Sequence, residues 1–162
     1  MVQLVVTVTV GDLTHEDLPA CAWSGTATHV ASVARELDRA QRGEVDYLAV
    51  CPPSNLPVAI GEVDYQACPG AGMLSQLAVQ AAWQSCGLGT ILVRAAEQRI
   101  LARGLDRAEL GVEVNNPRAR SLYERLGYVA YSRRPEAWDE ELPDGSLTRY
   151  ETVCTLMRKR LR

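Results

Sequence analysis

The chain has 162 residues, of which 47% are hydrophobic and 23% charged, and its net charge is −3. That length supports one sizeable core, so we expect a single domain over residues 1–162. The charge argues against a general nucleic-acid-binding protein, which would carry an excess of basic residues. The five cysteines form no Cys-x-x-Cys pair, and with only two histidines we expect no metal site.

The first segment, Val2–Val10, is apolar but too short to cross a bilayer. It also lacks the basic flank and the cleavage site of a signal peptide. We therefore expect it to be a first β-strand. The same observations favour a cytoplasmic protein with reduced cysteines and no membrane partner.

Two helices are expected next. The first covers Asp12–Ala20, where Thr14 suits the N-cap position and Asp17 follows three residues later. The second runs from about Thr28 to Arg42, with its apolar residues on one face and a glycine just after its end.

Three strands and a third helix follow. Asp46–Cys51 and Pro57–Tyr65 are separated by a turn rich in proline and asparagine, which is typical of a hairpin. Leu74–Val79 comes after a glycine-rich turn and has the pattern of a buried strand. From Leu88 to Arg103 the hydrophobic period is that of an amphipathic helix, which Gly104 ends.

The segment between this strand and this helix indicates an anion site. It reads Gln-Ser-Cys-Gly-Leu-Gly-Thr over residues 84–90, and its glycines let backbone N–H groups crowd around a phosphate at a helix N-terminus. A P-loop would need a lysine after Gly89, and a dinucleotide fingerprint would need a third glycine where Leu92 stands. Taken alone, two glycines could also mean only a tight turn.

A second local pattern follows the strand expected over Arg107–Val114. Asn116 suits an N-cap, Pro117 suits the first helical position, and Gly127 ends the helix. The apolar residues of this helix share one face: Ala119, Leu122, Tyr123 and Leu126.

Together the two patterns resemble the GNAT superfamily of acyl-CoA N-acyltransferases. The family's loop motif, Gln/Arg-x-x-Gly-x-Gly/Ala, is matched by Gln84, Gly87 and Gly89. Its second motif, Asn-x-x-Ala-x-x-Leu-Tyr-x-x-x-Gly-Phe/Tyr, is met at every position from Asn116 to Tyr128. The resemblance implies an α/β fold with a mixed, mostly antiparallel, twisted sheet of seven strands flanked by helices. It also implies acetyl-CoA as co-substrate, with no metal.

The resemblance further assigns roles to particular residues. Backbone groups of Leu77 and Val79 would bond the pantetheine arm of the donor, and the N–H at or beside Val79 would face the carbonyl oxygen. Asn116 would contact the same arm, unless it only caps its helix. Tyr123 would protonate the leaving thiolate, unless it is only a core residue. The remaining donor-binding residues would hold the pyrophosphate: Gln84, Cys86, Gly87, Leu88, Gly89 and Thr90.

Some parts of the expected site stay open. Glu62, Glu113 and Gln76 are all candidates for the general base, and a water chain is another. Cys86 stands where the family often has a basic residue or glycine, which removes a charge near the phosphate but leaves the backbone donors. The proline that the family often has shortly after the residue at Val79 is also absent.

The chain ends in two expected strands, Tyr128–Arg134 and Arg149–Arg160. We expect the segment between them, Pro135–Thr148, to be a long polar loop. It carries Trp138 and four carboxylates, Asp139, Glu140, Glu141 and Asp144. The loop is either solvated surface or a lid over the acceptor that attracts a cationic amine.

We therefore predict an N-acetyltransferase that moves an acetyl group from acetyl-CoA to a primary amine of a small molecule or peptide. The predicted mechanism is direct attack in a ternary complex, and a homodimer is one possible assembly. A non-catalytic acyl-CoA-binding regulatory module is the alternative, since it would need the loop but not Tyr123. A nucleotide-phosphate binder is a third option. The acceptor, and whether the acyl group is acetyl or longer, stay open.

Overall fold

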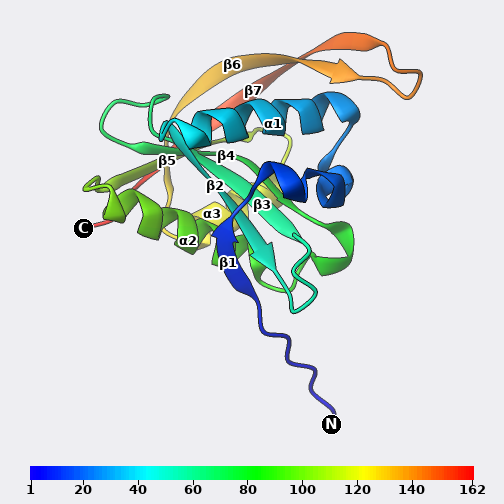
Figure 1. The fold of residues 1–162 in the computed structure, drawn as a ribbon. Helices are drawn as coiled ribbons and strands as arrows, with labels where there is room; N and C mark the ends of the chain where they lie inside the picture. Colours follow the sequence, from blue (N-terminus) through cyan, green and yellow to red (C-terminus); the bar gives the residue numbers. More distant parts are fainter.

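Seven strands form one mixed sheet with helices on both faces in the computed structural model, which describes all of residues 1–162 (Figure 1). The sheet order is β1-β2-β3-β4-β5-β7-β6, and every neighbouring pair is antiparallel except β4 with β5. The predicted fold class and element order are confirmed. In chain order the elements are β1 (Thr9–Asp12), η1 (His15–Ser24), α1 (Ala27–Gln41), β2 (Val45–Cys51), β3 (Ala59–Asp64), β4 (Gly72–Val79), η2 (Ala81–Trp83), α2 (Leu88–Ala102), β5 (Arg107–Glu113), α3 (Pro117–Arg125), β6 (Val129–Glu141) and β7 (Leu147–Arg160).

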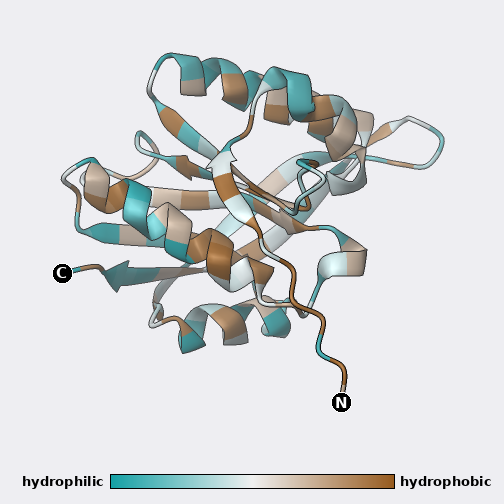
Figure 2. Ribbon diagram, turned by 60° about the horizontal axis from the view of Figure 1, so that its bottom comes forward, coloured by the Kyte–Doolittle hydropathy of each residue, from teal (hydrophilic) through white to brown (hydrophobic).

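The helices divide the core into two layers. Helix α1 and η1 cover one face of the sheet, while α2 and α3 lie on the other (Figure 1). Strand β2 serves both layers, because successive side chains of a strand point to opposite faces. Tyr47 and Ala49 pack under α1, whereas Leu48 and Val50 pack under α2. Apolar stretches accordingly concentrate in the strands and on the inner sides of the helices (Figure 2).

The parallel pair β4–β5 separates partway along its length. Pairing runs only from Gly72 with Ala108 to Leu74 with Leu110, after which the two strands diverge. Beyond this point β4 keeps only β3 as a partner. The divergence leaves backbone groups of β4 and β5 facing a gap in the middle of the sheet.

A β-bulge in β4 orients the backbone groups of Val79 toward this gap. Gln76 and Leu77 together lie opposite Gly61 of β3, and Gln76 has a φ of 53°. After the bulge, the Gln80 N–H bonds the Val58 carbonyl at 2.8 Å. Because antiparallel pairing alternates, the backbone groups of Val79 therefore point away from β3 and toward the gap.

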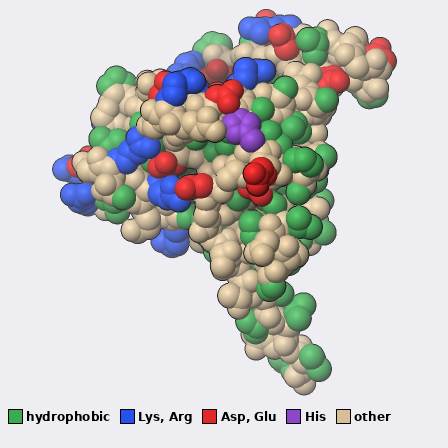
Figure 3. Space-filling model, viewed as in Figure 1, with side chains coloured by type: hydrophobic (Ala, Val, Ile, Leu, Met, Phe, Trp, Pro, Cys, Tyr) green, Lys and Arg blue, Asp and Glu red, His purple; other side chains and the backbone are tan.

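The N-terminal strand is shorter than predicted. Only Thr9–Asp12 form β1, and Thr9 pairs with Cys51, the last residue of β2. Residues 1–8 have no strand beside them because Pro52 follows Cys51, so the expected strand over Val2–Val10 is wrong for most of its length. This segment projects from the body and carries hydrophobic side chains but no charged ones (Figures 1 and 3).

The first helix is a 3-10 helix that begins and ends later than predicted. It covers His15–Ser24 and contains Pro19, which lacks the N–H that an α-helix would use. The predicted N-terminal cap is confirmed, because the Asp17 carboxylate accepts a hydrogen bond from the Thr14 N–H at 2.9 Å.

The predicted loop over Pro135–Thr148 is wrong. Strands β6 and β7 continue as a ribbon until Glu141 pairs with Leu147. The ribbon extends beyond the helical layers, so both of its faces are largely exposed and its strands are polar. Pro135 is tolerated because β6 is an edge strand. No helix in the structure combines the length and the apolar character needed to cross a membrane.

Candidate active site

A cavity of about 500 Å³ opens between η2, the start of α2 and α3, and we call it the α2 cavity. Seven residues predicted to bind the donor line it together with others: Val79, Trp83, Gln84, Ser85, Gly87, Leu88, Gly89, Thr90, Asn116, Arg118, Ala119, Leu122 and Arg125. The loop motif and the second motif therefore meet at one cavity, although they lie far apart in the sequence.

The loop that enters α2 has a backbone shape that exposes N–H groups. Gly87 is the N-cap of α2 and has a φ of 86°, a conformation that glycine adopts without strain. The helix that follows leaves its first N–H groups unpaired at this end, where the helix dipole is positive. The Gln84 side chain donates to the Val79 carbonyl at 3.1 Å and so ties the loop to the end of β4.

Helix α3 supplies two cations that sequence reasoning missed. Arg118 and Arg125 line the α2 cavity, and Arg118 also donates a hydrogen bond to the Ser85 hydroxyl of the loop. They are seven residues apart, which places them on one side of a helix, and that spacing was a signal available in the sequence. These two arginines are the basic side chains of the α2 cavity lining.

A close approach between helices holds α3 against α2. A Cβ on Gly89 would lie 3.2 Å from the Leu122 Cδ2 atom. Asn116 caps α3, as predicted, by accepting a hydrogen bond from the Ala119 N–H at 3.2 Å. The glycines of the loop therefore serve both the backbone conformation and the packing of α3.

A second cavity, of about 960 Å³, lies where β4 and β5 diverge, and we call it the β4–β5 cavity. Its walls come from β4, β5, α1, α3 and the tip of the β6–β7 ribbon. Asn116 and Ala119 line both cavities, so the two cavities meet at the first turn of α3. Leu77 and Tyr123, two of the predicted site residues, line the β4–β5 cavity.

Tyr123 lies on the wall of the β4–β5 cavity, one turn of α3 after Ala119. Its ring packs edge-on against Tyr128 with centroids 6.2 Å apart. Burial raises the pKa of Tyr123 above its ordinary value, so the hydroxyl keeps its proton at neutral pH. Tyr123 therefore packs against the core and also lines the cavity, and its role as an acid stays a prediction.

The far wall of the β4–β5 cavity is acidic and aromatic. The Tyr150 hydroxyl donates to Glu113 at 3.0 Å, and the ring of Tyr150 lies 5.0 Å from that of Trp138. Glu113 and Trp138 both line the cavity. A cationic group entering here would meet a carboxylate and an indole face.

The carboxylates of the ribbon are not equivalent. Asp139, Glu140 and Glu141 line the cavity, but Asp144 does not. Asp139 is paired with Arg149 at 3.4 Å, and Glu141 accepts a hydrogen bond from the Thr28 N–H at 3.1 Å, which lowers its pKa. Glu140 forms no ion pair. Charged side chains of both signs are mixed over the adjoining α1 face (Figure 3).

Comparison with known proteins decides the family. The model of the acetyltransferase (GNAT) family matches residues 23–128, which include both motifs. The chain belongs to the GNAT family. The family is one of acetyltransferases.

The individual proteins that resemble this GNAT chain match it either over a short segment or at low sequence identity. It is 46% identical over 58 residues to a mycothiol acetyltransferase of Beutenbergia cavernae, a match that covers 36% of this chain and only 20% of that protein. In fold it resembles the ribosomal-protein-S18-alanine N-acetyltransferase of Escherichia coli, with a TM-score of 0.70 at 20% identity over 96% of this chain and 94% of that one. It also resembles yncA of Salmonella typhimurium, a structure solved with acetyl-CoA, with a TM-score of 0.70 at 17% identity over 96% and 95% of the two chains.

One residue predicted to hold the donor of this GNAT chain lies apart from the others. Cys86 is exposed and does not line either cavity, although its loop neighbours do. Its thiol turns back toward the carbonyl of Gln84, 3.6 Å away. Any contribution of residue 86 to the site would therefore come from its backbone.

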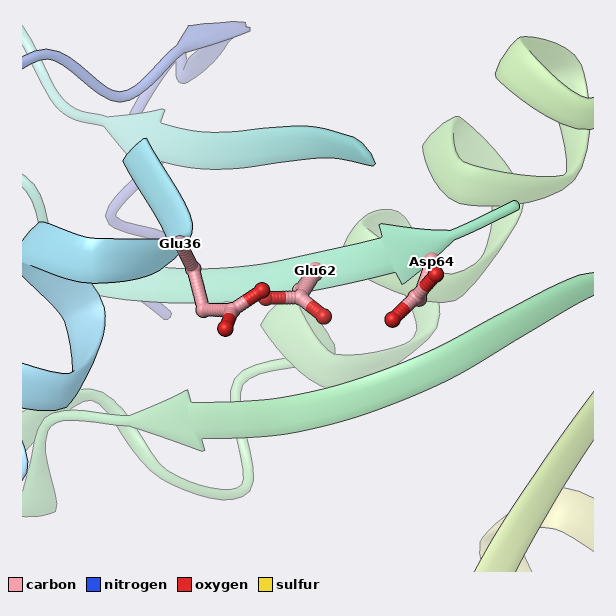
Figure 4. A group of neighbouring side chains, drawn as sticks. All are labelled: Glu36, Glu62 and Asp64. Carbon is pink, nitrogen blue, oxygen red and sulfur yellow. The ribbon is translucent and has the colours of Figure 1, made fainter. Parts of the chain in front are cut away.

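The three candidates for the general base occupy different surroundings. Glu113 lies directly on the cavity wall. Gln76 also lies there, but it accepts from the Tyr47 hydroxyl at 2.8 Å and donates to Ser32 at 3.3 Å, so it has a structural role. Glu62 is buried behind the wall and approaches Glu36 and Asp64 (Figure 4).

Proposed function

We propose that this GNAT-family protein is an N-acetyltransferase that uses acetyl-CoA to acetylate a primary amine. The observation that carries the proposal is the meeting of the two cavities at Asn116 and Ala119, with Tyr123 beside the junction. A donor that fills the α2 cavity could pass its thioester end into the β4–β5 cavity, where an amine would approach from the acidic wall.

Donor binding would depend on backbone groups and two arginines. The N–H groups at the start of α2 suit the pyrophosphate, and Arg118 and Arg125 suit a further phosphate. Backbone groups of Leu77 and Val79 would bond the pantetheine arm, since Val79 faces the gap between the strands. This arrangement would hold the thioester carbon in place for attack.

Transfer would be direct. The amine lone pair attacks the thioester carbon, the Val79 N–H stabilises the developing oxyanion, and Tyr123 gives its proton to the departing thiolate. The new amide nitrogen loses its extra proton to water, and water returns a proton to Tyr123. An oxyanion donor of this kind is typically worth about 3 kcal/mol. Glu113, with Trp138 nearby, would hold the cationic acceptor before it reacts.

The experiment that tests this function is a panel of primary amines, with release of the coenzyme A thiol as the readout. Diamines, amino sugars and peptides with free N-termini should be included, because both small molecules and peptides fit the proposal. Thiol release that depends on one class of amine supports the enzyme. Tight coenzyme A binding without thiol release for any amine favours a regulatory module instead.

A further inference from the structure

A buried carboxylate lies directly behind the wall of the β4–β5 cavity. Glu62 of β3 is only 3% exposed, yet no cation contacts it. The Ser75 hydroxyl, which lines the cavity, donates to Glu62 Oε1 at 3.2 Å. The other oxygen, Oε2, is buried and has no hydrogen-bond partner. One side chain therefore connects an uncompensated acid to the cavity.

The groups around Glu62 leave it without a positive partner. Helix α1 contributes Glu36, and β3 itself contributes Asp64; carboxylate oxygens of the three residues lie within 4.8 Å of one another (Figure 4). Arg39 of α1 bonds Glu36 at 2.7 Å and Asp64 at 2.9 Å, but not Glu62. The Tyr47 hydroxyl of β2 donates its hydrogen bond to the Gln76 amide oxygen instead. Burial and the neighbouring Glu36 raise the pKa of Glu62 to about 8.

A proton suits this cluster better than a metal ion does. One nitrogen of Arg39 already contacts both Glu36 and Asp64, so the positive charge that would bind between these two carboxylates is present in the fold. A divalent ion would be repelled by that guanidinium. A proton held by Glu62 removes the charge of the one carboxylate that Arg39 does not reach.

We propose that Glu62 is a positioning residue that receives the proton of the acceptor ammonium through Ser75. The inference rests on the proposed amine acetylation. The Glu62 carboxylate turns the Ser75 hydroxyl proton inward, which leaves a lone pair of Ser75 Oγ facing the cavity. Glu62 then accepts that proton as Ser75 takes one from the substrate.

The transfer balances in charge and in protons. An ammonium N–H bond breaks as its proton bonds Ser75 Oγ, and the original Ser75 proton moves to Glu62 Oε1. The products are a neutral amine, an unchanged serine and a neutral Glu62 carboxylic acid. The amine keeps the electron pair with which it attacks the thioester carbon. Once the product has left, the proton on Glu62 returns through Ser75 to water in the cavity.

The raised pKa of Glu62 suits it to accept a proton from an amine. A group that titrates near pH 8 can accept a proton from an amine and return it to water without a large free-energy penalty. A carboxylate with the ordinary pKa of glutamate would be a weaker base, and a carboxylate with no hydrogen bond to the cavity lining could not accept the proton. Glu113, on β5, is a separate carboxylate of the cavity lining that would bind the ammonium.

The test is the pH dependence of kcat/KM, measured with the best amine of the panel and with a second amine of different pKa. In the wild-type enzyme, kcat/KM should rise with pH and show an ascending limb near pH 8. The position of this limb should be the same for both amines, because it reports Glu62 and not the substrate. Glu36→Gln removes a negative neighbour, so the limb should move to lower pH by at least half a unit. Glu62→Gln should abolish the limb and reduce kcat/KM at pH 8 by about 100-fold or more.

Two further variants separate a relay from a structural role. Ser75→Ala should lose activity as Glu62→Gln does, while Ser75→Thr, which keeps the hydroxyl, should recover most of it. Glu97→Gln is the matched control, because Glu97 is also a buried glutamate but is fully paired with Lys159 and Tyr128. Its pH limb should stay at the wild-type position.

A readout independent of turnover is the ¹³C carboxyl signal of glutamate-labelled protein. One glutamate should titrate near pH 8, shift in Glu36→Gln and disappear in Glu62→Gln. If thiol release is normal but the limb does not move in Glu36→Gln, the relay is wrong and the proposed function stands. If no amine releases thiol, the proposed function fails and the relay fails with it. Glu36→Gln alters a partly exposed helix position, so it remains informative even if Glu62→Gln does not fold.

Discussion

The side chain of Leu77 occupies the space beside Gly61 so closely that a Cβ on Gly61 would lie 2.3 Å from Leu77 Cδ2. The two residues face each other across the bulge between β3 and β4. Leu92 of α2 approaches the same point, at 3.1 Å. Glycine at position 61 therefore gives the bulged strand room to lie against the core and to turn its backbone toward the gap.

Gly61→Ala is expected to lower the free energy of unfolding by about 1–3 kcal/mol, because the added methyl group forces Leu77 to move. The displaced bulge should also weaken coenzyme A binding. Gly11→Ala is the matched control, since it too adds a methyl group in a strand but meets nothing within 4 Å. Urea unfolding of both variants checks the prediction, which fails if the two lose the same stability.

Tyr123→Phe is expected to reduce kcat by roughly 10²–10⁴-fold while coenzyme A affinity stays the same, because only the proton donor is removed. Titration calorimetry with coenzyme A and steady-state kinetics measure the two quantities separately. Tyr131→Phe, at a tyrosine that is 40% exposed on β6, provides the control. A Tyr123→Phe enzyme with normal turnover would show that the ring serves packing alone.

Arg118→Gln and Arg125→Gln should each weaken coenzyme A binding, by about tenfold at low salt, because each removes a charged partner for phosphate. The loss should shrink as salt is added. Arg120→Gln is the control on the same helix, since Arg120 is paired with Glu124 and does not line the cavity. Equal losses from Arg118→Gln and Arg120→Gln would contradict the assignment.

Neutralising Glu140 and Glu141 together should raise the KM of a cationic acceptor by a few fold at low ionic strength, because both line the acidic wall. The effect should diminish at high salt, and coenzyme A binding should not change. Asp144→Asn removes a charge from the same ribbon outside the cavity. An acceptor KM that does not respond would mean that these carboxylates only keep the ribbon solvated.

Glu62 is expected to make stability depend on pH even without substrate. Its pKa rises from 4.5 to about 8 on folding, so the native state binds more protons than the unfolded chain between these values. The stability from this group is full below about pH 4.5 and decreases as the pH rises to about 8, by up to about 1.4 kcal/mol per unit. The difference between wild type and Glu62→Gln in urea unfolding at pH 6 and pH 8 isolates this slope. A difference that does not change with pH would show that Glu62 titrates normally.

The parts of the fold that short-range chemistry controls were predictable from the sequence. Asn116 and Pro117 start α3 and Gly87 starts α2, because capping, a fixed φ and a positive φ are properties of a few adjacent residues. The hydrophobic periods located the central strands and the longer helices to within a few residues. The two motifs, read together, were sufficient to predict the family, and most of the residues that they assign to the donor line the α2 cavity.

The tertiary structure alone decided the features that depend on distant partners. Val2–Val8 has a strand-like pattern but no neighbouring strand, whereas Pro135–Glu141 is polar and proline-containing but is held in β6 by its pairing with β7. Arg118 and Arg125 became cavity residues only when α3 packed against α2. The raised pKa of Glu62 likewise depends on burial and on Glu36, which is 26 positions away in the chain. The electrostatic surroundings of a side chain come from the folded molecule and not from its neighbours in sequence.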